Sequence, residues 1–316
     1  MSEVSSFFDS LPEKVRNAFP AEIQKEIIKF RCDVHENPEL SHQEFETRKR
    51  IIRQLKAWDI GNIHLVGETG LIAKIPGEDP TAPIYAVRGD IDALPIQENT
   101  GLPFASTNDG IMHACGHDVH TTWALAAAYL FKTRPAKGDV WVLFQPAEET
   151  ATGAKAVLET GALDGVQAIF GAHVDRQYPI GKVVVKPGPI ASFSDAFSIV
   201  VTGSACHAAR PEEGKNPLQP LGRIIESIET VQNEFSEKPE NLVIVSPTQL
   251  VGGDRANMIP ETASCSGTIR CMQAETREKL LKRLEQWAQD IAADYGCTAE
   301  LQLTPRSPGI FNQSPF

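Results

Sequence analysis

The chain has 316 residues, of which 41% are hydrophobic and 22% are charged, and its formal net charge is −11. This length suggests about two domains with buried cores, and the negative charge argues against non-specific binding of nucleic acid. The sequence contains no run of 18 apolar residues, and its first residues lack the basic and apolar pattern of a leader, so neither a membrane span nor secretion is indicated.

Six cysteines are spread along the chain without the regular spacing of a disulfide framework. In a chain of this length, such cysteines are typical of reduced thiols in an intracellular protein. We therefore expect a cytoplasmic protein.

The chain begins with two predicted amphipathic helices. Apolar residues recur at helical spacing over residues 11–31, with an interruption at Pro20, and a turn is expected over residues 33–40. A second helix is expected from about Ser41, because the Ser41 hydroxyl and Glu44 have the spacing of a capping box.

Short strands are predicted between residues 62 and 87, and the apolar run at 84–87 is typical of a buried strand. This strand leads to Asp90 and Asp92 at its carboxyl end, where open α/β sheets build their sites. Two carboxylates one residue apart also occur in solvated turns. Their position after a buried strand favours a site.

Residues 112–120 hold three histidines, one cysteine and one aspartate. Thiolate, imidazole and carboxylate groups are the ligands of zinc and similar metals. Cys115 and His117 lie in a loop broken by glycine, directly before an apolar run, so we expect them at a helix N-terminus, which favours a thiolate. A structural zinc site is the alternative, but such sites usually show paired cysteine spacings, which this chain lacks.

Two further predicted strands lead to possible ligands. The continuous apolar run at 140–144, typical of a sheet covered on both faces, precedes Glu148 and Glu149. Neighbouring residues point in different directions, so one glutamate can bind a metal while the other faces a substrate. A third buried strand at 166–170 leads to His173. Without the cluster at 112–120, the glutamates would be a solvated pair and His173 a hydrogen-bonded core residue.

After residue 188 the pattern predicts an α+β domain with the element order βαββαβ, the split ferredoxin-like arrangement. The strands are expected at 193–202, 242–251, 263–270 and 298–303, and the helices at 217–235 and 275–295. The expected domains are a catalytic domain over 1–188, an inserted domain over 189–303, and a segment over 304–316 that begins the return to the catalytic domain.

Several short motifs occur in the order of a known family: RCDVH from residue 31, DIDALP from 90, HACGHD from 113, FQPAEE from 144, GAH from 171 and HAARP from 207. The chain resembles the N-acyl-amino-acid amidohydrolase branch of the metallo-carboxypeptidase and aminoacylase superfamily, which includes hippurate and auxin-conjugate hydrolases. The likeness covers nearly the whole chain. It implies an α/β fold, with a mixed sheet flanked by helices as in zinc exopeptidases and an inserted ferredoxin-like dimerisation domain.

The resemblance also implies a site with two divalent metal ions, which are zinc, manganese, cobalt or nickel, and a water between them. By the family's pattern Cys115 bridges the ions, and His117, Glu149 and His173 are further ligands. Glu148 is then the general base that removes a proton from the water.

Other roles follow from the same resemblance. Asp92 matches an acidic residue behind a metal ligand, and Asp118 is comparable. His207 matches a histidine that reaches the active site of the partner in a homodimer, and Asn257 matches a substrate-binding position. Arg270 is expected to clamp a substrate carboxylate through its bidentate geometry, and an exposed charge at a strand end is the equally weighted alternative.

The family continues beyond the ferredoxin-like domain and supplies a last metal-binding histidine, whereas this sequence contains no histidine after Cys297. We expect either a fragment with a weaker second metal site or a replacement ligand. The predicted function is metal-dependent hydrolysis of the amide bond of N-acyl-amino acids, with release of the acyl group. The alternatives are a truncated, weakly active or inactive homologue that binds metal or dimerises, and a metallo-carboxypeptidase or dipeptidase.

Overall fold

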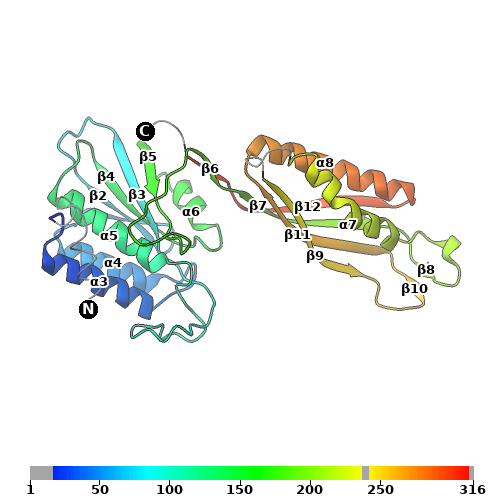
Figure 1. Cartoon of the computed structure of the whole chain (residues 1–316), viewed down its shortest axis with the longest axis horizontal. Helices are drawn as coiled ribbons and strands as arrows, with labels where there is room; N and C mark the ends of the chain where they lie inside the picture. The colour runs from blue at the N-terminus through cyan, green and yellow to red at the C-terminus, as the bar shows by residue number, and fades with distance from the viewer. Residues whose placement is uncertain (1–16, 237–241, 313–316) are drawn as a thin grey trace. The chain divides into compact units, whose positions relative to one another are not determined.

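The computed structural model describes residues 17–236 and 242–312 (Figure 1). The chain divides into two compact units, Met1–Ile180 and Gly181–Phe316. Among the described helices, none is both long enough and apolar enough to span a membrane. The part of the first predicted helix before residue 17 lies outside the described residues.

The first unit is built on a five-stranded mixed sheet with the order β1-β2-β4-β3-β5. The strands are β1 (Ile63–Val66), β2 (Gly70–Ile75), β3 (Ile84–Asp90), β4 (Val140–Gln145) and β5 (Val166–Gly171). β3 pairs in parallel with both β4 and β5, whereas β2 is antiparallel to β1 and β4. The carboxyl ends of β3, β4 and β5 therefore lie at the same edge of the sheet.

Helices cover both faces of this sheet (Figure 1). They are α3 (Ala21–Glu36), α4 (Phe45–Ala57), α5 (His117–Thr133) and α6 (Gly153–Glu159). Val142 and Phe144 of β4 join a core with α3, α4 and α5, while Trp141 and Leu143 join a second core with Val157 of α6. Successive side chains of a strand point to opposite faces of the sheet, so β4 contributes to a core on each face. The predicted mixed sheet flanked by helices is confirmed.

The expected capping box at the start of α4 does not form. Ser41 donates its hydroxyl to Oδ2 of Asp92 instead. Glu44 is fully buried, and its carboxylate accepts hydrogen bonds from Oγ1 of Thr69 and from the backbone N–H of Ala147. Tertiary partners therefore outcompete the local cap. Residues 33–36, expected to be in a turn, continue α3.

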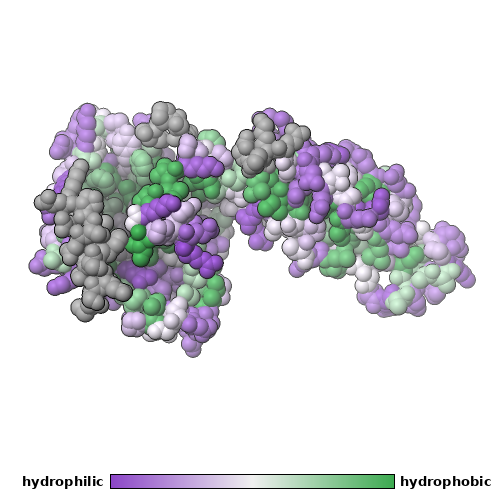
Figure 2. Space-filling model, viewed as in Figure 1, coloured by the Kyte–Doolittle hydropathy of each residue, from purple (hydrophilic) through white to green (hydrophobic). Residues whose placement is uncertain are grey.

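β5 lies where it was expected, but the prediction that it is buried is wrong. It is the last strand of the sheet order, and Ile169 and Phe170 are each 50% exposed. Its start joins the core, where Val166 packs beside Ile84, and the ring centroid of Phe170 lies 6.3 Å from that of Tyr85. Figure 2 shows hydrophobic surface in the region where Figure 1 draws β5 and the segment that follows it.

The second unit contains a four-stranded antiparallel sheet with the order β12-β7-β11-β9. Its elements are β7 (Phe193–Thr202), α7 (Leu218–Asn233), β9 (Val243–Gly252), β11 (Thr262–Cys271), α8 (Ala274–Asp294) and β12 (Thr298–Ser307). Both helices pack on one face of the sheet through a common core that includes Leu221, Leu284 and Ile199. The predicted βαββαβ arrangement is confirmed.

Short elements complete the second unit. A 3-10 helix, η1, covers Pro211–Glu213. Two small antiparallel pairs form, one between β6 (Gly188–Ala191) and β13 (Ile310–Asn312), the other between β8 (Cys206–His207) and β10 (Met258–Ile259).

Candidate active site

The loop that carries Cys115 and His117 ends at the N-terminus of α5, as expected. Gly116 is the N-cap residue and has a left-handed φ of 87°. Glycine adopts this conformation without the strain that a side chain causes. A Cβ on Gly116 would also lie 2.4 Å from Cγ2 of Val174. The glycine therefore turns the chain so that Cys115 and His117 flank the start of the helix.

Asp92 orients the imidazole of His117. Nδ1 of His117 lies 2.9 Å from the backbone oxygen of Asp92 and 3.2 Å from its Oδ1. Both atoms accept hydrogen bonds, so Nδ1 carries a proton and Nε2 is the nitrogen available to a ligand. Burial acts to raise the pKa of Asp92, but hydrogen bonds from His117, Ser41 and Glu149 hold it below its ordinary value.

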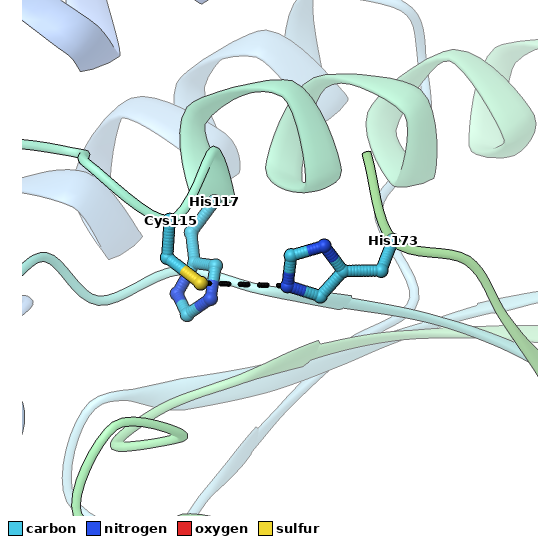
Figure 3. Close-up of side chains that lie close together, drawn as sticks. All are labelled: Cys115, His117 and His173. Atoms are coloured by element: carbon cyan, nitrogen blue, oxygen red, sulfur yellow. Dashed lines mark hydrogen bonds between the residues drawn. The ribbon is translucent and has the colours of Figure 1, made fainter. Parts of the chain in front are cut away.

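Cys115 and His173 face each other across the site (Figure 3), with Sγ 3.4 Å from Nε2. Nδ1 of His173 donates to the backbone oxygen of Val174, which leaves Nε2 turned toward the sulfur. The imidazoles of His117 and His173 beside the Cys115 thiol lower its pKa. The hydrogen bond with Cys115 in turn raises the pKa of His173 to about 9. The pair therefore favours a thiolate.

Glu148 and Glu149 follow β4, and both carboxylates lie near His117. Oε1 of Glu149 lies 3.7 Å from Nε2 of His117, and Oε2 of Glu148 lies 3.9 Å from the same nitrogen. The Glu149 side chain is 18% exposed, whereas that of Glu148 is 42% exposed. Burial raises the pKa of Glu149. The buried glutamate suits a ligand, and the more exposed one can reach solvent.

The donor groups fit divalent metal ions. Nε2 of His117 and Oε1 of Glu149 are buried and have no hydrogen-bond partner among the described residues, although buried polar atoms nearly always have one. A cation between these atoms would satisfy both. Ligand atoms of Cys115, His117 and His173 lie within 4.8 Å of one another, as do those of His117, Glu148 and Glu149. Two overlapping groups of thiolate, imidazole and carboxylate suit borderline divalent ions.

The electrostatic surroundings of His117 also favour a bound cation. Burial disfavours a charged imidazole, but the hydrogen bond with Asp92, the neighbouring Cys115 and the nearby charge of Asp90 outweigh it and raise the pKa of His117 to about 11. The surrounding acceptors therefore stabilise positive charge at Nε2.

Two buried residues behind this centre, Asp90 and His120, belonged to the predicted motifs but were given no role of their own. Asp90 and His120 are each 1% exposed, and Oδ1 of Asp90 lies 2.7 Å from Nδ1 of His120. Nε2 of His120 accepts a hydrogen bond from the backbone N–H of Val174. The sequence did carry a signal, because Asp90 ends a buried strand and His120 lies one helical turn after His117.

The second unit brings two of its three predicted substrate-binding residues together. His207 pairs with Met258 between β8 and β10, and the N–H of Ala208 donates to the oxygen of Asn257, so His207 and Asn257 are close and both exposed. Arg270 is not part of this group. It is exposed near the opposite end of β11, where it pairs with Ser194.

A thiolate, imidazoles and carboxylates gathered where three strands end define a metal-dependent hydrolase of the α/β class. The chain belongs to peptidase family M20/M25/M40, whose model matches residues 86–309. It is 44% identical over 293 residues to the N-acetylcysteine deacetylase of Bacillus subtilis, across 92% of this chain and 77% of that protein. It is 36% identical over 281 residues to the IAA-amino acid hydrolase ILR1-like 2 of Arabidopsis thaliana, across 88% of this chain and 63% of that protein.

A solved structure has the same fold. The YXEP protein of Bacillus subtilis, described as a dinuclear metal binding peptidase from the M20 family, has a TM-score of 0.81 and 42% identity, across 92% of this chain and 76% of that one. The predicted resemblance to the amidohydrolase branch and the predicted enzyme class, a metal-dependent amidohydrolase, are confirmed.

Proposed function

We propose that this enzyme hydrolyses the amide bond of N-acyl-amino acids at a centre of two divalent metal ions held by Cys115, His117, Glu149 and His173. The observation that carries the proposal is the convergence of the Cys115, His117 and His173 ligand atoms within 4.8 Å. The N-acetylcysteine deacetylase at 44% identity supports the substrate class. The dinuclear centre named for the YXEP protein agrees with the expected pair of ions.

Glu148 and Asp92 have different roles beside the ions. When bound, the ions make water more acidic and polarise the carbonyl of the scissile amide. Oε2 of Glu148 is half-exposed beside His117 and accepts a proton from the attacking water, then returns it to the departing nitrogen. Asp92 keeps Nδ1 of His117 protonated, so Nε2 stays a ligand.

The second unit completes the proposal with substrate recognition. His207 and Asn257, exposed on the paired strands β8 and β10, contact the substrate carbonyl or carboxylate, and Arg270 remains a proposed carboxylate clamp. The enzyme works as a homodimer in which His207 serves the centre of the partner. The cytoplasmic location is part of the proposal, since the six cysteines are free and Cys115 must stay reduced.

A mixing experiment tests the homodimer. Glu148→Gln and His207→Ala chains are each expected to be nearly inactive, but their mixture regains activity, because one centre in the heterodimer combines an intact Glu148 with an intact partner His207. Equal inactivity of the mixture after confirmed subunit exchange would show that His207 does not act across the dimer.

The reaction itself is tested with a panel of N-acetyl and N-benzoyl amino acids and unblocked dipeptides, with zinc, manganese, cobalt or nickel. We expect acyl release from the blocked amino acids and little cleavage of the dipeptides. The reverse preference would favour the second candidate, a carboxypeptidase or dipeptidase, which the name of the peptidase family supports. No turnover by a chain that holds metal would favour a metal-binding protein without catalysis.

A further inference from the structure

His120 makes two hydrogen bonds that determine which of its ring nitrogens carries the proton. The backbone N–H of Val174 lies 3.0 Å from Nε2 of His120, and because a backbone N–H can only donate, Nε2 must be the unprotonated nitrogen. Nδ1 therefore carries the proton and donates it to Oδ1 of Asp90 at 2.7 Å. Asp90 is held from its other side by Arg88, whose guanidinium lies 2.7 Å from Oδ2.

These bonds leave His120 without a free lone pair. Ligand atoms of Asp90, His117 and His120 lie within 4.8 Å of one another, which is close enough to hold a cation. A nitrogen binds a metal only through its lone pair, and the lone pair of Nε2 is engaged by Val174 while Nδ1 carries a proton. His120 therefore supports the centre without touching an ion.

Val174, whose N–H donates to His120, lies directly after His173. Both backbone groups of Val174 are held, its N–H by Nε2 of His120 and its C=O by Nδ1 of His173. The ring of His120 also packs edge-on against the ring of His173, with centroids 4.5 Å apart. The chain has left β5 at Gly171 and forms no regular structure here, so these contacts take the place of a strand in fixing the histidine.

We propose that His120 is a positioning residue. Held by Asp90, it accepts a hydrogen bond from the backbone N–H of Val174 and so orients Nε2 of His173 toward the metal centre. The proposal rests on the metal-binding role proposed for His173. Partners of this kind around a metal ligand typically change metal affinity by about 10–100-fold when they are removed.

Two amide substitutions separate the two bonds of His120. In His120→Asn the amide lies near the position of Nδ1, so it can donate to Asp90 but cannot reach Val174. In His120→Gln the amide lies near the position of Nε2, so its oxygen can accept the Val174 N–H. Leu125→Ala is the matched control, because Leu125 is a fully buried residue of the same helix that belongs to the apolar core.

The test measures zinc affinity of the metal-free full chain by titration against a competing chelator, with thermal unfolding to verify folding. We expect His120→Asn to lose about 10–100-fold in affinity, while His120→Gln and Leu125→Ala stay within a few-fold of wild type. Equal affinity of wild type and a folded His120→Asn chain would overturn the positioning role alone. If the wild-type chain binds no zinc, the proposed function falls together with this inference.

A second readout needs no metal and no variant. Nitrogen-15 NMR of the histidine rings in the metal-free wild-type chain reports which nitrogen of each imidazole is protonated. We expect His120 to be the tautomer protonated at Nδ1. The tautomer protonated at Nε2 would contradict the proposal even if the asparagine variant did not fold.

Discussion

The backbone N–H of Glu149 donates a 3.0 Å hydrogen bond to Oδ2 of Asp92. This bond joins the segment after β4 to the segment after β3, while Oδ1 of the same carboxylate faces Nδ1 of His117. Asp92 therefore fixes two of the proposed metal ligands, Glu149 and His117, relative to each other.

Asp92→Asn should weaken metal binding by about 10–100-fold, because the neutral amide loses the charge that orients His117 and one acceptor for Ser41 or Glu149. Zinc titration of the metal-free chain measures this change. Ser41→Ala is the control, since it removes only one of the partners of Asp92, and its affinity should stay close to that of wild type. An asparagine variant with unchanged affinity would show that Asp92 has no such role.

Glu148 and Glu149 should respond differently to the same substitution. Glu148→Gln should retain the metal and lose at least ~10²-fold in turnover, the low end of general acid–base effects, since the amide cannot accept a proton. Glu149→Gln should lose metal, because it replaces a more buried carboxylate that lies 3.7 Å from Nε2 of His117. Metal content and kcat measured on the same samples separate the two outcomes. Near wild-type turnover in a metal-replete Glu148→Gln chain would exclude Glu148 as the base.

Cys115 should react with iodoacetamide at lower pH than an ordinary thiol in the metal-free chain. The neighbouring imidazoles of His117 and His173 lower its pKa, so the reactive thiolate persists as the pH falls below the usual value. Cys265 is the internal comparison, because burial raises its pKa to about 11. Mass spectrometry of alkylated peptides against pH gives both profiles. Zinc should protect Cys115, and a Cys115 profile shifted to higher pH would contradict the geometry.

Gly116→Ala should lower the free energy of unfolding more than Gly101→Ala does. Both glycines have positive φ, 87° and 70°, which costs a side chain about 1–2 kcal/mol. A Cβ at Gly101 meets no described atom within 4 Å, whereas one at Gly116 would overlap Cγ2 of Val174. This overlap should add about 1–3 kcal/mol. Urea unfolding of the two variants measures the difference, and equal losses would show that Val174 moves aside freely.

The sequence was sufficient for the features that depend on local pattern. The apolar run of β4 predicted a strand covered on both faces, and its buried alternation between Val142 and Leu143 confirms this. Glycine at position 116, followed by an apolar run, predicted a helix N-terminus at Cys115 and His117, and α5 begins at His117. The ferredoxin-like order of the second unit followed from element types alone.

The local sequence pattern could not predict features that depend on residues far away in the chain. Ser41 and Glu44 have the spacing of a capping box, but each binds a residue from another segment, Asp92 and Thr69 respectively. The apolar composition of β5 predicted burial, whereas its place at the end of the sheet order leaves Phe170 exposed. His120 belonged to the predicted cluster at 112–120 but received no separate role, because nothing in the sequence shows that Val174 donates to it.

The central claim is tested most directly by the rate of acyl release from an N-acetyl amino acid as zinc or manganese is titrated into the metal-free chain. The account predicts no hydrolysis without metal and a rate that rises until two ions are bound per chain. Hydrolysis that survives complete removal of metal, or none at any metal content of the folded chain, would contradict it.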